Sequence, residues 1–149
     1  MRKDKIKNKI IEINDSLELI NKNMVNNYED FLNLGIVKDG IYKRLEYSIE
    51  NLLDILYILN SDLHLGTPFD DSNLIDNLNK NNLIDKNTAG IIKKMKGLRN
   101  IIVHRYSYID DSMVYEFLKN DINDFYNIIN IINSIVDKKD QWSLLYFFE

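Results

Sequence analysis

The chain has 149 residues, of which 45% are hydrophobic and 28% are charged, with a net charge of −4. This length suits a single domain with its own core, and the negative charge excludes a protein that binds nucleic acid through a broad basic surface. The absence of cysteine excludes disulfides, thiol nucleophiles and zinc sites built on cysteine.

Long helices are expected along the chain, because the whole sequence holds only one proline and five glycines. Apolar residues three or four positions apart from Ile6 to Phe31 predict a first helix that ends near Gly35 or before it. A second stripe at helical period predicts another helix over residues 41–61. The charged start, residues 1–5, and the lack of any apolar run of about 18 residues predict a cytoplasmic protein without a membrane span.

A turn over residues 64–71 follows, and Asp71 or Ser72 is expected to cap a short helix over residues 74–83. His64 lies within this turn. A single histidine in an exposed turn is expected to be an incidental surface residue. A further cap signal at residues 85–88 opens a helix that runs to about Arg105.

The last predicted helix begins at residues 110–112, where Asp110 and Asp111 are expected to act as caps, and it runs to about Val136. From about residue 138 the chain has an apolar extension that is expected to pack on the body or on a partner chain. The aromatic and aliphatic residues of this extension are Trp142, Leu144, Leu145, Tyr146, Phe147 and Phe148. The sum is an all-α fold: one domain over residues 1–149, an antiparallel bundle of four main helices and one short helix.

A polar cluster marks the end of the helix that precedes the last one: Arg99, Asn100, His104 and Tyr106. A helix C-terminus carries partial negative charge and favours a protonated imidazole. Such a histidine can transfer protons during RNA cleavage, while an arginine stabilises the charge of the phosphorane, and neither step needs a metal ion. Arg99 and His104 are therefore candidate catalytic residues.

The helical period sets a constraint on this site. At 100° per residue His104 shares a polar stripe with Asn100 and Gly97, away from the core, whereas Arg99 lies about 140° from His104. Three arrangements would bring the two together: Arg99 reaches round the helix, the helix loosens after Val103, or a second chain completes the site at a symmetric cleft.

The spacing also fits an ordinary helix end. In that interpretation Arg99 pairs with Glu50 or Asp54 on a facing helix, and His104 and Tyr106 have no special role. The two carboxylates are expected to be polar partners of the cluster rather than metal ligands. Asp54 is the expected additional supporting residue.

The cluster Arg99-Asn100-x-x-x-His104-x-Tyr106 resembles the R-x4-H-x-Y signature of the HEPN superfamily, in its HepT-like toxin branch. Residues 45–55 resemble the second-helix pattern of that family, and residues 95–98 match the Met-x-Gly-Leu that precedes its arginine. The resemblance therefore covers nearly the whole chain, except the apolar extension.

This resemblance implies a symmetric homodimer, the toxin of a type VII-like toxin–antitoxin system with an MNT-type nucleotidyltransferase antitoxin. It implies a ribonuclease that needs no metal or other cofactor, with Arg99 and His104 as active-site residues and Asn100 in support. It also implies that the antitoxin transfers AMP to Tyr106, where a bulky anionic adduct would fill the cleft and compete for Arg99.

Two other functions remain open on the sequence. The chain could be a non-catalytic helical module that binds RNA, a nucleotide or a nucleotidyltransferase partner, which its lack of basic charge and of a second motif histidine favours. It could also be a purely structural helical dimer.

Overall fold

The computed structural model describes the backbone of residues 1–104 and 110–148, and the side chains of these residues as far as residue 139. Within this part the chain forms helices and no strand, so the all-α fold expected from the sequence is confirmed. The described helices are α1 (Lys3–Asn23), α2 (Tyr28–Leu32), α3 (Ile36–Asp62), α4 (Asp71–Lys80), α5 (Lys86–His104), α6 (Asp111–Asn120) and α7 (Asp124–Phe148).

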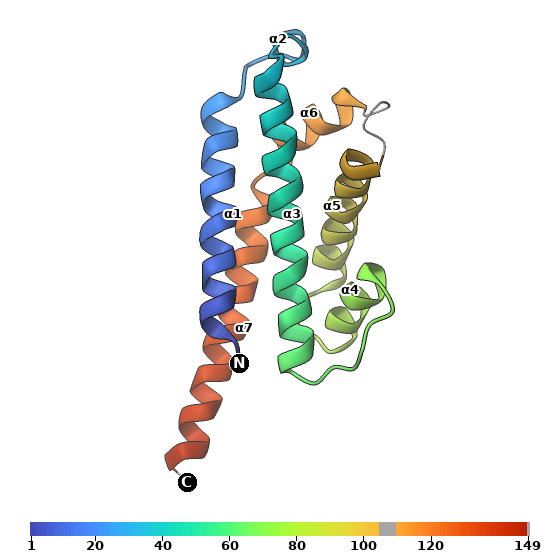
Figure 1. Ribbon diagram of the computed structural model, residues 1–149. Coiled ribbons are helices and arrows are strands. Elements are labelled where there is room, and N and C mark those ends of the chain that lie inside the picture. Colours follow the sequence, from blue (N-terminus) through green and yellow to red (C-terminus); the bar gives the residue numbers. More distant parts are fainter. Residues whose placement is uncertain (105–109, 149) are drawn as a thin grey trace.

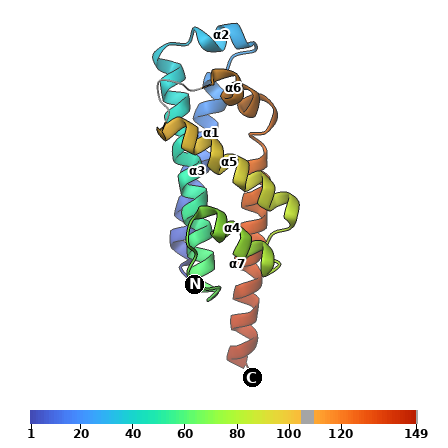
Figure 2. The ribbon, with the colours of Figure 1, turned by 90° about the vertical axis from the view of Figure 1, so that its right-hand side faces the viewer.

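Helices α1, α3 and α7 run along one common axis (Figure 1), and α1 packs antiparallel against α3. Figure 2 shows α5 crossing obliquely from the side of α7 to the side of α3, so that its C-terminal end lies beside α3. The apolar stripes of these helices meet in one core, in which Ile13, Leu52, Ile92 and Phe125 have no exposed surface. Burial of each such side chain contributes about 1.5–3 kcal/mol, which is why the stripes determine the packing.

The first predicted helix is divided in the structure, which corrects the single helix expected from Ile6 to Phe31. Helix α1 ends at Asn23, and the chain turns before α2 begins. Asn27 caps α2, because its side-chain oxygen accepts a hydrogen bond from the backbone N–H of Asp30 at 2.8 Å. Phe31 still reaches the core, with its ring 5.3 Å from that of Tyr115.

The last predicted helix is also divided, at residues 121–123 between α6 and α7. Asp121 ends α6, and its backbone N–H donates to the carbonyl oxygen of Phe117 at 2.8 Å. The rings of Phe117 and Phe125 meet edge to face, with centroids 6.1 Å apart, and hold the two helices together across the break.

The apolar extension from about residue 138 continues α7 as helix as far as Phe148. Figure 1 shows these last turns extending beyond the other helices, past the N-terminus. None of the helices in the described residues is long and apolar enough to cross a membrane.

The caps of the shorter helices determine what the site residues can contact. Asp70, and not Asp71 or Ser72, is the N-cap of α4, since its carboxylate accepts from the N–H of Asn73 at 2.8 Å. The expected cap signal before α5 is confirmed by Asp85, which accepts from the N–H of Thr88 at 2.7 Å. Because Asp70 does the capping, the side chain of Asp71 is available to other helices.

Candidate active site

The motif occupies the C-terminal turns of α5, and its tyrosine, Tyr106, lies outside the described residues. The apolar stripe of α5, on the face away from His104, packs into the core, as expected. The buried residues of this stripe are Ile92, Met95, Leu98 and Ile102. This packing fixes the roll of α5, so Arg99 and His104 leave the helix in different directions.

Arg99 is turned toward α4, and its side chain is only 19% exposed. Its Nη2 donates to Oδ2 of Asp71 at 2.6 Å, and Oδ1 of the same carboxylate accepts from the hydroxyl of Tyr57 at 2.7 Å. The expected pairing with Glu50 or Asp54 is therefore replaced by one with Asp71. Asp54 pairs instead with Nζ of Lys9 on α1, at 3.3 Å.

Tyr57 on α3 has a hydroxyl that stays protonated far above neutral pH. Burial is the main cause that raises the pKa of Tyr57 to about 12, and the hydrogen bond and negative charge of Asp71 add to it, while Arg99 acts in the opposite direction. Tyr57 is therefore a permanent donor to Asp71, and Asp71 is the acceptor for both Tyr57 and Arg99.

Two further polar contacts join α4 to α5. Lys96 donates to the hydroxyl of Ser72 at 2.8 Å, and Lys93 pairs with Asp76 at 2.6 Å. These contacts run along the two helices beside the Arg99 pair. They leave Nε of Arg99 buried without an acceptor among the residues that the structure describes.

His104 is the last residue of α5 and is exposed, whereas Asn100 is half-buried. His104 lies about 7.5 Å further along the helix axis than Arg99, because α5 remains helical through His104 and the two residues are five positions apart. Arg99 is held against α4 and does not reach round the helix. The structure therefore separates the two motif residues within one chain.

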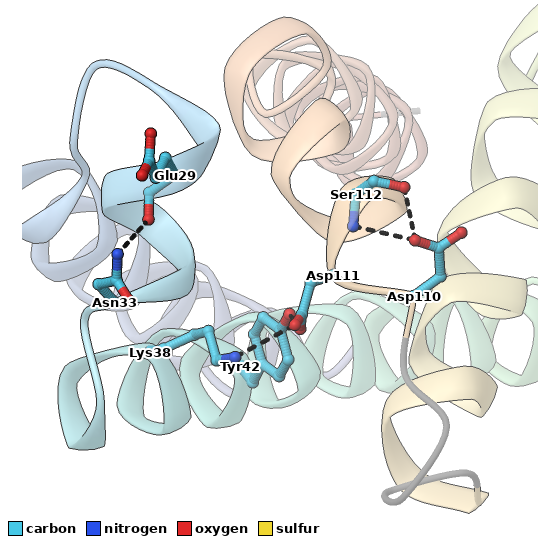
Figure 3. Close-up of polar contacts among 7 residues, drawn as sticks. All are labelled: Glu29, Asn33, Lys38, Tyr42, Asp110, Asp111 and Ser112. Atoms are coloured by element: carbon cyan, nitrogen blue, oxygen red, sulfur yellow. Dashed lines mark hydrogen bonds and ion pairs between the residues drawn. The ribbon is translucent and has the colours of Figure 1, made fainter.

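The start of α6 is anchored to α3 close to the end of α5 (Figure 3). Asp110 caps α6, accepting from the N–H of Ser112 at 3.0 Å, as expected. Asp111, however, lies in the first turn and binds α3: Lys38 approaches it at 3.2 Å, and the hydroxyl of Tyr42 donates to it. Burial, followed by Asp111, raises the pKa of Tyr42.

A hollow of about 180 Å³ lies between α3 and the end of α5, lined by Tyr42, Lys43, Glu46, Ile102 and Val103. Val103, which lines this hollow, is the neighbour of His104 in the sequence.

His64 lies apart from the motif, in the turn after α3, and it is exposed with a left-handed backbone (φ 56°). Across the described ranges, 1–104 and 110–139, no three His, Asp or Glu side chains gather where they could hold a metal ion.

Asp71 and Tyr57 are the site residues that sequence reasoning missed. The available signal was the doublet Asp70-Asp71, in which one carboxylate suffices to cap the helix and the second is left over. The doublet Asp110-Asp111 has the same form and the same division of roles.

A family model described as "Ribonuclease HepT-like" matches residues 13–132. The mRNA nuclease HepT of Shewanella oneidensis is 31% identical over 98 residues, which cover 66% of this chain and 74% of the relative. These helices and the motif at the end of α5 define a helical domain of the ribonuclease type. The chain belongs to the HepT-like family.

Solved structures agree with this assignment. The tri-AMPylated HEPN toxin of Shewanella oneidensis, in complex with MNT antitoxin, superposes with a TM-score of 0.81 at 29% identity, covering 88% of this chain and 98% of that one. YutE from Bacillus subtilis, a cytosolic protein of unknown function, gives a TM-score of 0.80 at 16% identity and covers 93% of each chain. This second likeness shows the fold alone.

The Tyr57–Asp71 contact predicts a specific loss of stability in alkali. The folded pKa of about 12 lies above the ordinary value of 10.0, so the protonated hydroxyl stabilises the fold fully below pH 10, and this contribution is lost as the pH rises toward 12. Urea titrations at about pH 9 and at about pH 11 give the free energy of unfolding at the two pH values. From the lower to the higher pH, this free energy should therefore fall less in Tyr57→Phe than in the wild type.

Tyr47→Phe is the matched control, because the Tyr47 hydroxyl also donates to a carboxylate, that of Glu12 at 2.9 Å, on the exposed side of α3. The same two titrations on this variant show how much of any change follows from the removal of a tyrosine hydroxyl as such. Equal pH dependence in Tyr57→Phe and the wild type would contradict the assignment.

Proposed function

We propose that this chain is the ribonuclease toxin of a toxin–antitoxin pair, and that it cleaves RNA without a metal ion through Arg99 and His104. A nucleotidyltransferase antitoxin of the MNT type silences it by transferring AMP to Tyr106. The observation that carries this proposal is the R-x4-H-x-Y spacing at the end of α5 in a member of the HepT-like family. The proposed location is the cytoplasm, where both the RNA substrate and such a partner would be available.

The chemistry assigns one task to each motif residue. His104 is exposed at the end of α5 and transfers a proton to or from a ribose oxygen. The guanidinium of Arg99 stabilises the negative charge that accumulates on the phosphorane. The proposed supporting residues are Asn100, half-buried next to Arg99, and Asp54, which pairs with Lys9 of α1.

A homodimer completes this site. Within one chain Arg99 faces α4 and His104 lies exposed about a turn and a half further along α5, so the two do not face one phosphate. A symmetric dimer would place His104 of one copy near Arg99 of the other, and would form two equivalent sites.

The runner-up function is a helical module that binds RNA, a nucleotide or a nucleotidyltransferase without catalysis. The net charge of −4 favours it, and so does the pairing of Arg99 with Asp71, which already offsets the motif's positive charge. This function predicts tight binding without cleavage.

The purified protein is expected to cleave single-stranded RNA in the presence of EDTA. Arg99→Ala and His104→Ala should each lower the cleavage rate by at least about 100-fold, because each removes a group that acts in the transition state. Gel analysis of RNA fragments measures both rates.

Arg44→Ala and His64→Ala are the matched controls, since each removes the same residue type outside the motif. They should leave cleavage unchanged. Undiminished cleavage by both motif variants would refute the proposal, and RNA binding without any cleavage would support the runner-up.

Mixing the two inactive variants tests the composite site. If Arg99 and His104 act across the dimer, a mixed dimer of Arg99→Ala and His104→Ala keeps one intact site out of two. Random exchange of subunits should then restore about a quarter of wild-type activity, because about half of the dimers are mixed. No restoration after proven exchange, seen by native mass spectrometry of tagged chains, would place both residues in one chain.

Co-expression with an MNT-type nucleotidyltransferase should add AMP to this chain, as an intact-mass spectrum would show. Tyr106→Phe should abolish the addition, whereas Tyr108→Phe, two positions further on, should not. AMP retained by Tyr106→Phe would assign the modification to another residue.

A further inference from the structure

The carboxylate of Asp71 joins three helices at one point. Its Oδ1 accepts from Tyr57 of α3 at 2.7 Å and its Oδ2 accepts from Arg99 of α5 at 2.6 Å, while Asp71 itself begins α4. The side chains of Arg99 and Asp71 are 19% and 23% exposed, so water competes little for this pair. The contact is therefore a fixed feature of the fold and not a surface ion pair.

The contact uses only one edge of the guanidinium. An arginine has five N–H donors in a planar fork, of which Asp71 takes one at Nη2, while the buried Nε finds no acceptor among the described residues. The hydrogen bond from Nη2 to the carboxylate fixes the plane of the guanidinium. It leaves the N–H donors of Nη1 for a phosphate. The ordering of a long side chain is then achieved during folding and not during RNA binding.

Tyr57 in turn fixes the orientation of the Asp71 carboxylate. A free Asp71 side chain at a helix start would rotate toward the unpaired N–H groups of α4, but Asp70 already accepts from Asn73 there. The Tyr57 hydroxyl holds Oδ1, so that Oδ2 points at Arg99. Since its pKa is raised to about 12, Tyr57 donates at every pH at which RNA is stable.

We propose that Tyr57 and Asp71 are positioning residues for Arg99, which hold its guanidinium in the orientation that binds the scissile phosphate. This inference rests on the proposed ribonuclease function and assigns that site two further residues. The pair contacts Arg99 and not the substrate. The opposite role, in which Asp71 withholds Arg99 from RNA, predicts the opposite sign in the same experiment.

Asp71→Asn keeps the shape of the side chain and removes its charge, and Tyr57→Phe removes only a hydroxyl. On a short single-stranded RNA we expect kcat to fall about tenfold in Asp71→Asn and about threefold in Tyr57→Phe, with little change in KM, because orientation matters most in the transition state. The double variant should be no slower than Asp71→Asn alone, since Tyr57 acts through Asp71.

Two controls separate positioning from packing. Asp76→Asn breaks the other α4–α5 ion pair, with Lys93 at 2.6 Å, and Tyr47→Phe breaks another tyrosine–carboxylate bond of α3. Both should keep wild-type kcat even where the melting temperature falls. An Asp71→Asn enzyme as active as Asp76→Asn, or more active than the wild type, would overturn the inference.

A second readout does not depend on cleavage. The Nε–H signal of Arg99 in a ¹⁵N NMR spectrum, assigned by its loss in Arg99→Ala, should exchange faster with water in Asp71→Asn and in Tyr57→Phe, but not in Asp76→Asn. An unchanged signal in Asp71→Asn would refute the positioning role. A wild-type protein that cuts no RNA would refute the proposed function instead, so the two failures can be told apart.

Discussion

Helix α3 is buried between α1 on one side and α4 and α5 on the other, and the position of the motif depends on this packing. Thirteen residues of α3 are buried, and they include both apolar residues and the polar Ser48, Asn51 and Asn60. The same helix supplies the hydroxyls of Tyr42 and Tyr57 to the carboxylates of two other helices. The apolar packing of one helix thus sets the polar geometry on both sides of the motif.

The two aspartate doublets show how the fold connects short helices to this scaffold. In each doublet the first residue, Asp70 or Asp110, satisfies the free N–H groups of its own helix. The second residue, Asp71 or Asp111, lies within the first turn, where the helix dipole also favours a negative charge, and it accepts from a tyrosine of α3. Each doublet therefore fixes both the start of a helix and its place on α3.

The sequence predicted the long helices because their apolar residues recur every three or four positions. It did not predict the breaks after Asn23 and Asn120, since Phe31 and Phe125 keep the same spacing across each break and reach the core from a new helix. The motif residues could be found by spacing and resemblance. The pairing of Arg99 with Asp71 could not, because it depends on which helix packs beside α5, and spacing along one helix says nothing of that.

The regulation that we propose at Tyr106 concerns the connection from α5 to α6, and the described residues on either side of this connection are held by the fold. Helix α5 is packed into the core up to Ile102, and Asp111 is bound to Lys38 and Tyr42 of α3. In the sequence Tyr106 is two residues from His104 and five from Asp111. Arg99 is already held by Asp71, whereas His104 is exposed. In the regulation that we propose, a bulky anionic adduct would act mainly on access to His104, because Arg99 is already held by Asp71.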